Sequence, residues 1–114
     1  MINIYHNPRC RKSRAGLEYL LNINPGARII YYLKDEPFSV QTLSSLIEKL
    51  DLKPVELVRT QEDFYKTELK GKTFSHQEWM EILVKNPQLI RRPIIETDRT
   101  AIIGEPPEEI RKIL

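Results

Sequence analysis

The chain is poor in cysteine, because Cys10 is the only one among its 114 residues. A single cysteine excludes an intrachain disulfide, and this usage is typical of a reducing compartment such as the cytoplasm. Long apolar runs are missing too, and Met1 is followed at once by strand-like residues instead of a basic region and an apolar stretch. We therefore expect no signal peptide and no membrane span or membrane partner.

Glycine and an excess of one charge are also lacking. The four glycines are dispersed, so neither a P-loop nor a dinucleotide-binding pattern is present. The net charge of +2 gives no strong field for nucleic acid, and the basic segment 9–14 lacks interleaved aromatic residues. No metal-ligand spacing surrounds His76. We expect no metal site and no nucleic-acid partner.

The residues that are present support one domain that begins with a βαβ unit. With 40% of its residues hydrophobic, the chain can bury one core. Residues 2–6 alternate as a strand does, and residues 27–33 are rich in β-branched and aromatic side chains. Between them, residues 11–21 carry apolar side chains on one helical face (Ala15, Leu17, Leu20 and Leu21) before a stop at 24–26. Short joints make these strands parallel and the crossover right-handed.

The middle of the chain is predicted to be helical. Ser39 can cap a helix over residues 40–50, and Pro54 can start a short one. Residues 60–72 are charged and suggest an exposed connection with one helical turn. The segment 75–78 is a capping box, and Phe74 with Trp79 fits a hydrophobic staple on a helix that ends before Pro87.

The end of the chain returns to β structure. Residues 93–96 and 101–103 flank 97–100 and indicate a hairpin, and residues 106–109 start a final helix. The order βαβ, helical block, ββ and helix predicts an α/β fold with a small mixed sheet and helices on its faces. Without the helical block, this order is the thioredoxin arrangement.

Cys10 stands where the first strand and turn give way to a helix. The free N–H groups of a helix N-terminus, together with the neighbouring cations, favour a thiolate and should lower the pKa of Cys10. These cations are Arg9, Arg11, Lys12 and Arg14. The same groups form an anion site. The pair Cys10 and Ser13 is C-x-x-S, so oxidised Cys10 needs an external thiol such as glutathione or a glutaredoxin. The phosphatase loop C-x5-R is absent, since Gly16 stands at its arginine position.

The segment Tyr5-His-Asn-Pro-Arg-Cys-x-x-Ser-Arg14 resembles the N-terminal signature of the arsenate reductase (ArsC) family, which also includes the Spx-type transcriptional regulators. The resemblance continues through 57–59 (Leu-Val-Arg) and 89–95 (Leu-Ile-Arg-Arg-Pro-Ile-Ile), in the family's order and spacing. It implies one thioredoxin-like domain over residues 1–114, with a mixed four-stranded sheet, a helical insertion at about 35–90 and a cytoplasmic location.

The resemblance also implies an activity, the reduction of arsenate to arsenite. In family members that reduce arsenate, the cysteine attacks the oxyanion to form a thiol–arsenic adduct, and glutathione and glutaredoxin complete the reduction without a bound cofactor. By similarity, Cys10 is the nucleophile, His6 helps to hold its thiolate, and Ser13 lies near the sulfur.

The oxyanion site carried over from the family contains arginines. Arg59 and Arg92 match family residues that bind the oxyanion, and Pro93 matches the cis-proline that faces the cysteine. Guanidinium groups offer planar, forked donors to a tetrahedral anion. Arg14 is a further candidate for anion binding, or else an exposed helix residue. Arg91 is expected to be an outward charge.

One position departs from the arsenate-reducing pattern. Glu105 stands before a proline where the reductases place an arginine, and a carboxylate there repels arsenate. One alternative is therefore an Spx-like regulator that binds RNA polymerase through the helical insertion, although C-x-x-S argues against an Spx-type disulfide switch. Another is a glutathione-linked reductase of a different small anion or of mixed disulfides. We expect a monomer in each case.

Overall fold

Four short strands form one mixed sheet in the computed structural model, which describes residues 1–114. The strands are β1 (Asn3–Tyr5), β2 (Arg28–Ile30), β3 (Ile94–Glu96) and β4 (Ala101–Ile103), in the order β2-β1-β3-β4. β1 pairs in parallel with β2 and antiparallel with β3, which pairs antiparallel with β4. The predicted α/β class, parallel βαβ unit and hairpin are confirmed.

The second strand of the βαβ unit is shorter than the sequence suggested. Helix α1 (Arg11–Ile23) connects the two strands and ends at Asn24, whose N–H donates to the Leu20 carbonyl. The second strand stops at Ile30 instead of continuing to residue 33. The reason is a turn, because the Tyr31 carbonyl accepts N–H groups from residues 34, 35 and 36.

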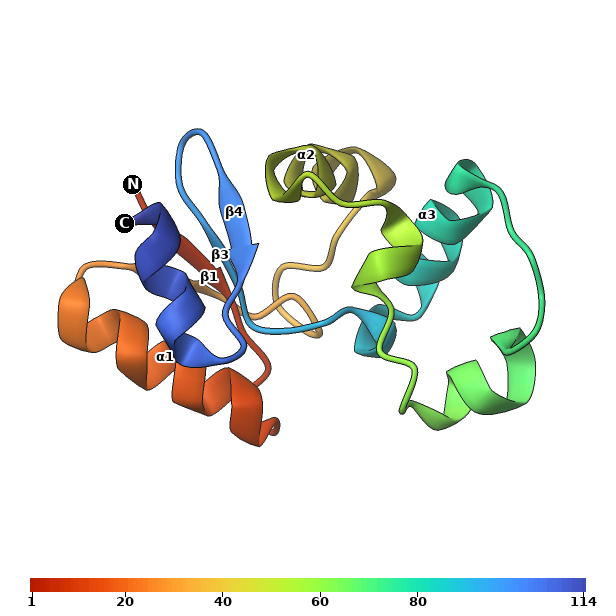
Figure 1. The fold of residues 1–114 in the computed structure, drawn as a ribbon, viewed down its shortest axis with the longest axis horizontal. Coiled ribbons are helices and arrows are strands. Elements are labelled where there is room, and N and C mark those ends of the chain that lie inside the picture. The colour runs from red at the N-terminus through yellow and green to blue at the C-terminus, as the bar shows by residue number, and fades with distance from the viewer.

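The two faces of the sheet are covered differently (Figure 1). Alternation along the strands places Ile4 and Ile95 on one face, where they meet Leu20 of α1 and Ile110 of the C-terminal 3-10 helix η4 (Pro107–Ile113). The opposite face contributes Ile94 and other residues to a larger cluster of 17 buried residues shared with the helical block. The sheet therefore separates a small core from a large one.

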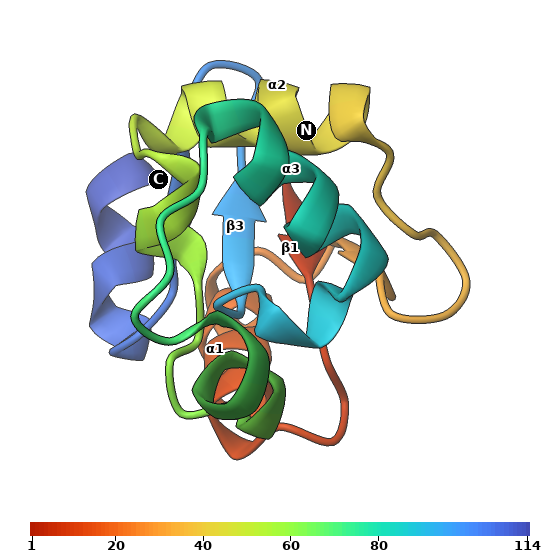
Figure 2. The same cartoon turned by 90° about the vertical axis from the view of Figure 1, so that its right-hand side faces the viewer.

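In the sequence, the helical block is inserted between β2 and β3. It faces the viewer in Figure 2. Its elements are α2 (Val40–Leu50), η1 (Pro54–Leu57), η2 (Tyr65–Leu69), α3 (His76–Lys85) and η3 (Pro87–Leu89). Both predicted caps are present, since the Ser39 and Ser75 hydroxyls accept N–H groups of the first helical turns. Phe74 and Trp79 pack edge to face at 5.0 Å between ring centroids, which confirms the staple.

Two sequence-based expectations need correction. The segment 60–72 is more than an exposed connection, because Leu69 on the π-helical turn η2 is buried in the large core. The buried residues of α1 are Ser13, Gly16 and Leu20, while Ala15 is exposed. Both differences arise from tertiary packing. No helix combines the length and apolar character needed to cross a bilayer.

Candidate active site

Cys10 is the N-cap residue of α1. Its backbone is extended (φ −98°, ψ 124°), its N–H donates to the Asn7 carbonyl at 3.1 Å, and its carbonyl accepts the Arg14 N–H at 3.0 Å. The side chain is half-buried. This geometry places the sulfur at the helix end where backbone N–H groups have no intrahelical acceptor.

A buried serine holds the loop that carries Cys10. Ser13 is fully buried, and its Oγ accepts the Asn7 N–H at 2.9 Å. The same Oγ shares a hydrogen bond of 2.7 Å with His6 Nδ1. Asn7 Oδ1 in turn accepts the Arg9 N–H at 3.0 Å. Ser13 thus ties β1, the turn and α1 together behind the sulfur.

His6 is joined to this loop through Ser13. The imidazole is 3% exposed. Burial, followed by the charge of Arg14, lowers the pKa of His6, against a smaller opposing contribution from Ser13. His6 is therefore a neutral imidazole at neutral pH. The family resemblance implies that His6 helps to hold the thiolate, and this role stays a prediction. In the structure the hydrogen bond of His6 goes to Ser13, so any effect of His6 on the sulfur would be relayed through Ser13.

The surroundings of Cys10 favour its thiolate. Burial alone would raise the pKa of Cys10, but the N–H of Ser13, the guanidinium of Arg92 and the N–H of Lys12 reverse the effect, and the net pKa lies below the ordinary value. A lowered pKa makes the sulfur more nucleophilic at neutral pH because the thiolate is the reactive form.

Arg92 stands just before β3, and its guanidinium helps to lower the pKa of Cys10. The residue is only 8% exposed, and its Nη1 donates to the carbonyls of Gln88 at 2.8 Å and Ile90 at 3.4 Å. The peptide bond between Arg92 and Pro93 is cis, as the family resemblance implies. Pro93 is buried beside Gly16 of α1. Packing thus fixes Arg92 relative to the helix that carries Cys10.

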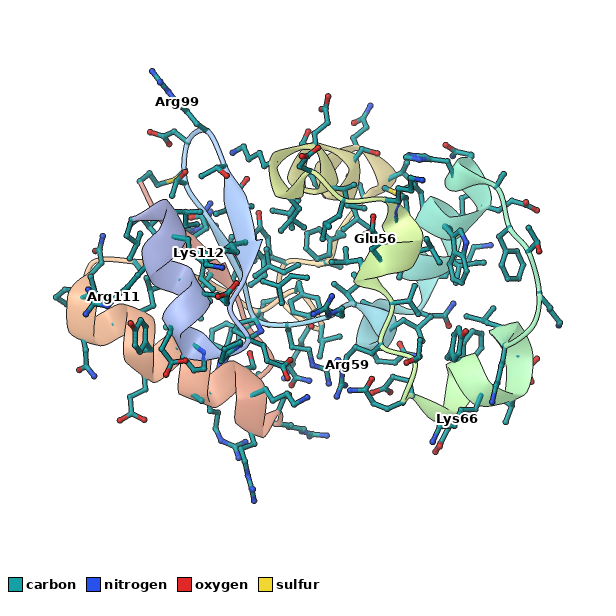
Figure 3. All side chains as sticks on the ribbon, viewed as in Figure 1. Glu56, Arg59, Lys66, Arg99, Arg111 and Lys112 are labelled. Atoms are coloured by element: carbon teal, nitrogen blue, oxygen red, sulfur yellow. The ribbon has the colours of Figure 1, made fainter.

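A cleft of about 330 Å³ adjoins this arginine. Its charged lining residues are Lys12, Glu56, Arg59, Arg91, Arg92 and Glu105. Most of these charges are already engaged. Arg59 pairs with Glu62 at 2.6 Å, Lys12 pairs with Glu105 at 2.6 Å, and Arg91 Nη1 donates to the Glu56 carbonyl at 3.3 Å. Arg59 follows η1 within the helical block, and Figure 3 shows it on the side of that block nearer α1.

The structure brings together most of the predicted site residues. Arg59 and Arg92 line one cleft, and Arg92 also helps to lower the pKa of Cys10. Arg14 is exposed and donates to the Pro8 carbonyl at 2.9 Å, so it braces the Cys10 turn instead of lining the cleft. Their roles in binding stay predictions.

Sequence reasoning missed three features of the site. Arg91 lines the cleft and is not an outward charge. The pairing of Lys12 with Glu105 joins segments far apart in the chain and had no local signal. Tyr32 is buried with a hydroxyl that has no hydrogen-bond partner, and the sequence gave no signal of this beyond its place at the end of a predicted strand.

Chemically, the arrangement combines a stabilised thiolate with a cleft lined by guanidinium groups. The thiolate is a nucleophile, and the guanidinium groups can bind oxygens of an anion. No group of three or more His, Cys, Asp or Glu side chains is placed to hold a metal ion. The site therefore suits attack by sulfur on an electrophile that carries negative charge or a disulfide.

Comparison with known proteins gives a consistent result over the whole chain. The model of the ArsC family matches residues 5–113. An arsenate reductase of Haemophilus influenzae is 37% identical over 97% of each chain. An uncharacterized protein of Escherichia coli, YfgD, is 36% identical over 99% of this chain and 96% of its own length.

A solved structure agrees with these matches. The arsenate reductase from Vibrio cholerae superposes with a TM-score of 0.89 at 36% identity, covering 99% of this chain and 97% of that one. The two proteins therefore share the same overall fold.

Proposed function

This chain belongs to the ArsC family, and we propose that it is a thiol-dependent oxidoreductase that reduces arsenate to arsenite, with Cys10 as the nucleophile. The observation that supports this most directly is the position of Cys10 at the N-cap of α1, with Arg92 favouring its thiolate. The activity of the Haemophilus and Vibrio relatives, as their names give it, points the same way.

In the proposed reaction, the Cys10 thiolate attacks arsenic and displaces one oxygen as water, forming a thiol–arsenic adduct. Two external thiols, which we propose to be supplied by glutathione and glutaredoxin, then provide two electrons to As(V) and leave as a disulfide. As(III) is released as arsenite and Cys10 is restored. External thiols are needed because Ser13 replaces a second cysteine and Cys10 is the only cysteine of the chain.

Arg92 and Arg59 are the residues proposed to hold the oxyanion. Arg92 is already oriented by backbone carbonyls, so it loses little freedom on binding. Arg59 must exchange Glu62 for the substrate, since the two side chains are 2.6 Å apart. Binding by Arg59 therefore has a cost that binding by Arg92 does not.

A second candidate is supported by the paired charges of the cleft. Because Glu105 neutralises Lys12 and Glu62 neutralises Arg59, the cleft attracts a multiply charged oxyanion less than its arginine content suggests. Cys10 could then serve in glutathione-linked reduction of mixed disulfides or of another small anion. Both candidates require the same thiolate and the same external thiols.

The decisive experiment measures arsenate-dependent NADPH oxidation, coupled through glutathione, glutathione reductase and glutaredoxin. We expect turnover by the unmodified protein and none by Cys10→Ser, whose fold is checked by circular dichroism. Arg59→Gln should raise KM for arsenate. Arg99→Gln removes a cation on the exposed hairpin tip (Figure 3) and should leave turnover unchanged.

The other outcomes separate the candidates. Cys10-dependent reduction of a glutathione mixed disulfide, without arsenate turnover, would replace the first proposal by the second. If neither reaction occurs, and Cys10→Ser protein still binds RNA polymerase stably, the Spx-like alternative is supported instead.

A further inference from the structure

A pocket of about 540 Å³ lies in the helical block, between η1, the segment that follows η2 and the start of α3. We call it the Trp79 pocket, after its aromatic lining residue. It shares no lining residue with the cleft beside Arg92. Its volume is within the range of about 300–1,000 Å³ that ligand pockets have. The proposed oxidoreductase reaction uses none of the residues that line it.

Apolar side chains form one part of the Trp79 pocket. Trp79 is 7% exposed and packs against the ring of Phe74, which also lines the pocket. Val55 of η1 is 48% exposed, so the fold leaves a large aliphatic side chain in contact with solvent at this place. Apolar walls with a few polar groups are typical of ligand pockets. The lining therefore suits an apolar ligand group such as a leucine side chain.

The charged groups of the Trp79 pocket have one sign. Lys53 and Lys72 line it, together with His76, and no aspartate or glutamate does. Both lysines are exposed, and neither takes part in an ion pair. Glu56 and Glu78 are close in sequence, but each accepts a backbone N–H group at the start of its own helix. The two free ammonium groups therefore favour an anionic ligand.

Unpaired backbone groups also border the Trp79 pocket. Residues 72–75 connect η2 to α3 without regular secondary structure. The N–H and carbonyl groups of Thr73 and Phe74 make no hydrogen bond within the protein, and both residues line the pocket. An extended peptide can pair its own N–H and carbonyl groups with such a segment. A small amphiphilic carboxylate has no N–H group to donate, so the backbone favours a peptide.

We propose that the Trp79 pocket is a docking site for an acidic peptide segment of a partner protein. One apolar side chain of the segment lies against Val55, Phe74 and Trp79, and its carboxylates lie beside Lys53 and Lys72. The proposal requires neither arsenate nor Cys10. Binding is therefore measured without either substrate or reductant, and a failure of the proposed reaction leaves it unaffected.

The test uses a synthetic peptide, acetylated and amidated, in which one leucine is flanked on each side by glutamates. Trp79 is the only tryptophan of the chain, so its fluorescence reports occupation of the pocket, and calorimetry measures the affinity independently. We expect saturable binding that weakens when salt is added, because the lysines are exposed. A peptide with lysines in place of the glutamates should not bind, and one with serine in place of the leucine should bind more weakly.

Two variants at exposed positions alter the pocket without unfolding the protein. Lys72→Gln and Val55→Ser should each weaken binding of the acidic peptide by about threefold to tenfold, the first through charge and the second through apolar contact. Lys66→Gln is the matched control, because Lys66 is an exposed lysine of η2 that does not line the pocket (Figure 3). Its affinity for the peptide should equal that of the unmodified protein.

Several results would overturn the proposal. One is the absence of saturable binding by the unmodified protein, and another is equal weakening in Lys72→Gln and Lys66→Gln. Binding of decanoate in preference to the peptide would assign the pocket to a small amphiphile instead. A dimer in analytical ultracentrifugation that is lost in Val55→Ser would assign it to a second copy of this chain.

Discussion

At the scale of single residues, the reactivity of Cys10 depends on only some of the cations near it in sequence. Lys12 acts through its backbone N–H, because its side chain is paired with Glu105. Arg14 is bound to the Pro8 carbonyl. The guanidinium that favours the thiolate is that of Arg92, which precedes β3 and is far from Cys10 in the sequence. For the pKa of Cys10, the partners that each cation already has matter more than its distance from Cys10 along the chain.

Glu105→Gln should strengthen oxyanion binding. The substitution frees Lys12 from its partner at 2.6 Å and removes a negative charge from the cleft lining. We expect arsenate to protect Cys10 from alkylation at about threefold to tenfold lower concentration, a change of about 1 kcal/mol for charges a few ångströms apart in water. Glu105→Arg should act in the same direction.

Glu108→Gln provides the matched control for this charge change. Glu108 is exposed and does not line the cleft, so its substitution should leave protection unchanged. Added salt should reduce the gain in Glu105→Gln because exposed charges are screened. Equal behaviour of the two variants would show that Glu105 does not act on the bound anion.

At the scale of elements, α1 is held close to the start of β3 by the absence of a side chain at Gly16. A Cβ at this position would overlap the Cγ of Pro93 and lie 3.4 Å from the Gly104 carbonyl oxygen. The proline ring cannot turn away as a flexible side chain would. Since Pro93 follows Arg92, this contact also sets the position of Arg92 relative to Cys10.

Gly16→Ala should therefore destabilise the protein although alanine is the better helix former. Overpacking typically costs about 1–3 kcal/mol, which exceeds the helix-propensity gain of about 1 kcal/mol. We expect a lower free energy of unfolding, measured in urea, and a higher pKa of the Cys10 thiol. Gly26→Ala is the control, because its Cβ would lie 3.6 Å from Asn24 Oδ1, an ordinary contact. Its stability should change by less than about 0.5 kcal/mol.

At the scale of the whole molecule, an ion pair joins the helical block to the sheet. Lys49 of α2 donates to Glu96 Oε2 of β3 at 2.8 Å and to the Thr97 carbonyl at 3.0 Å. The other oxygen of Glu96 accepts from Asn3 at 3.1 Å and Tyr5 at 2.8 Å. Burial alone would raise the pKa of Glu96, but these donors, with Lys49 the strongest, lower it.

Lys49→Met should lower the free energy of unfolding at neutral pH by about 1–2 kcal/mol, a value reduced from that of a fully buried pair because Lys49 is partly exposed. Because the pKa of Glu96 is lower in the folded protein than in the unfolded chain, ionised Glu96 stabilises the fold at pH values above the unfolded-state pKa. This stabilisation is lost as the pH falls through the folded-state pKa. The difference from the unmodified protein should therefore shrink in acid. Urea unfolding at several pH values measures it.

Lys112→Met tests whether the loss of stability is specific to the ion pair between Lys49 and Glu96. Lys112 also pairs with a glutamate at 2.8 Å, but its side chain is 64% exposed. Its removal should change stability by less than about 0.5 kcal/mol at any pH. A loss as large as that of Lys49→Met would mean that general charge, not the contact between α2 and β3, is responsible.

The parts of the fold that could be predicted from sequence are those whose signals are local. Ser39 and Ser75 cap their helices through N–H groups three residues away, and the hairpin follows from two apolar runs around a polar turn. The burial of Leu69 and the exposure of Ala15 depend on what packs against them. No pattern within their own segments contains that information.

The sequence by itself determined that Cys10 begins a helix, that Ser13 stands where a second thiol would be, and in which order the strands and helices occur. Only the tertiary structure decided that Arg92 lowers the pKa of Cys10, that Glu105 and Glu62 form ion pairs with Lys12 and Arg59, and that the buried Glu96 has a lowered pKa. The reason is range: caps and turns are made by backbone groups a few residues apart, whereas charge pairing in a cleft depends on which distant segments the core packs together.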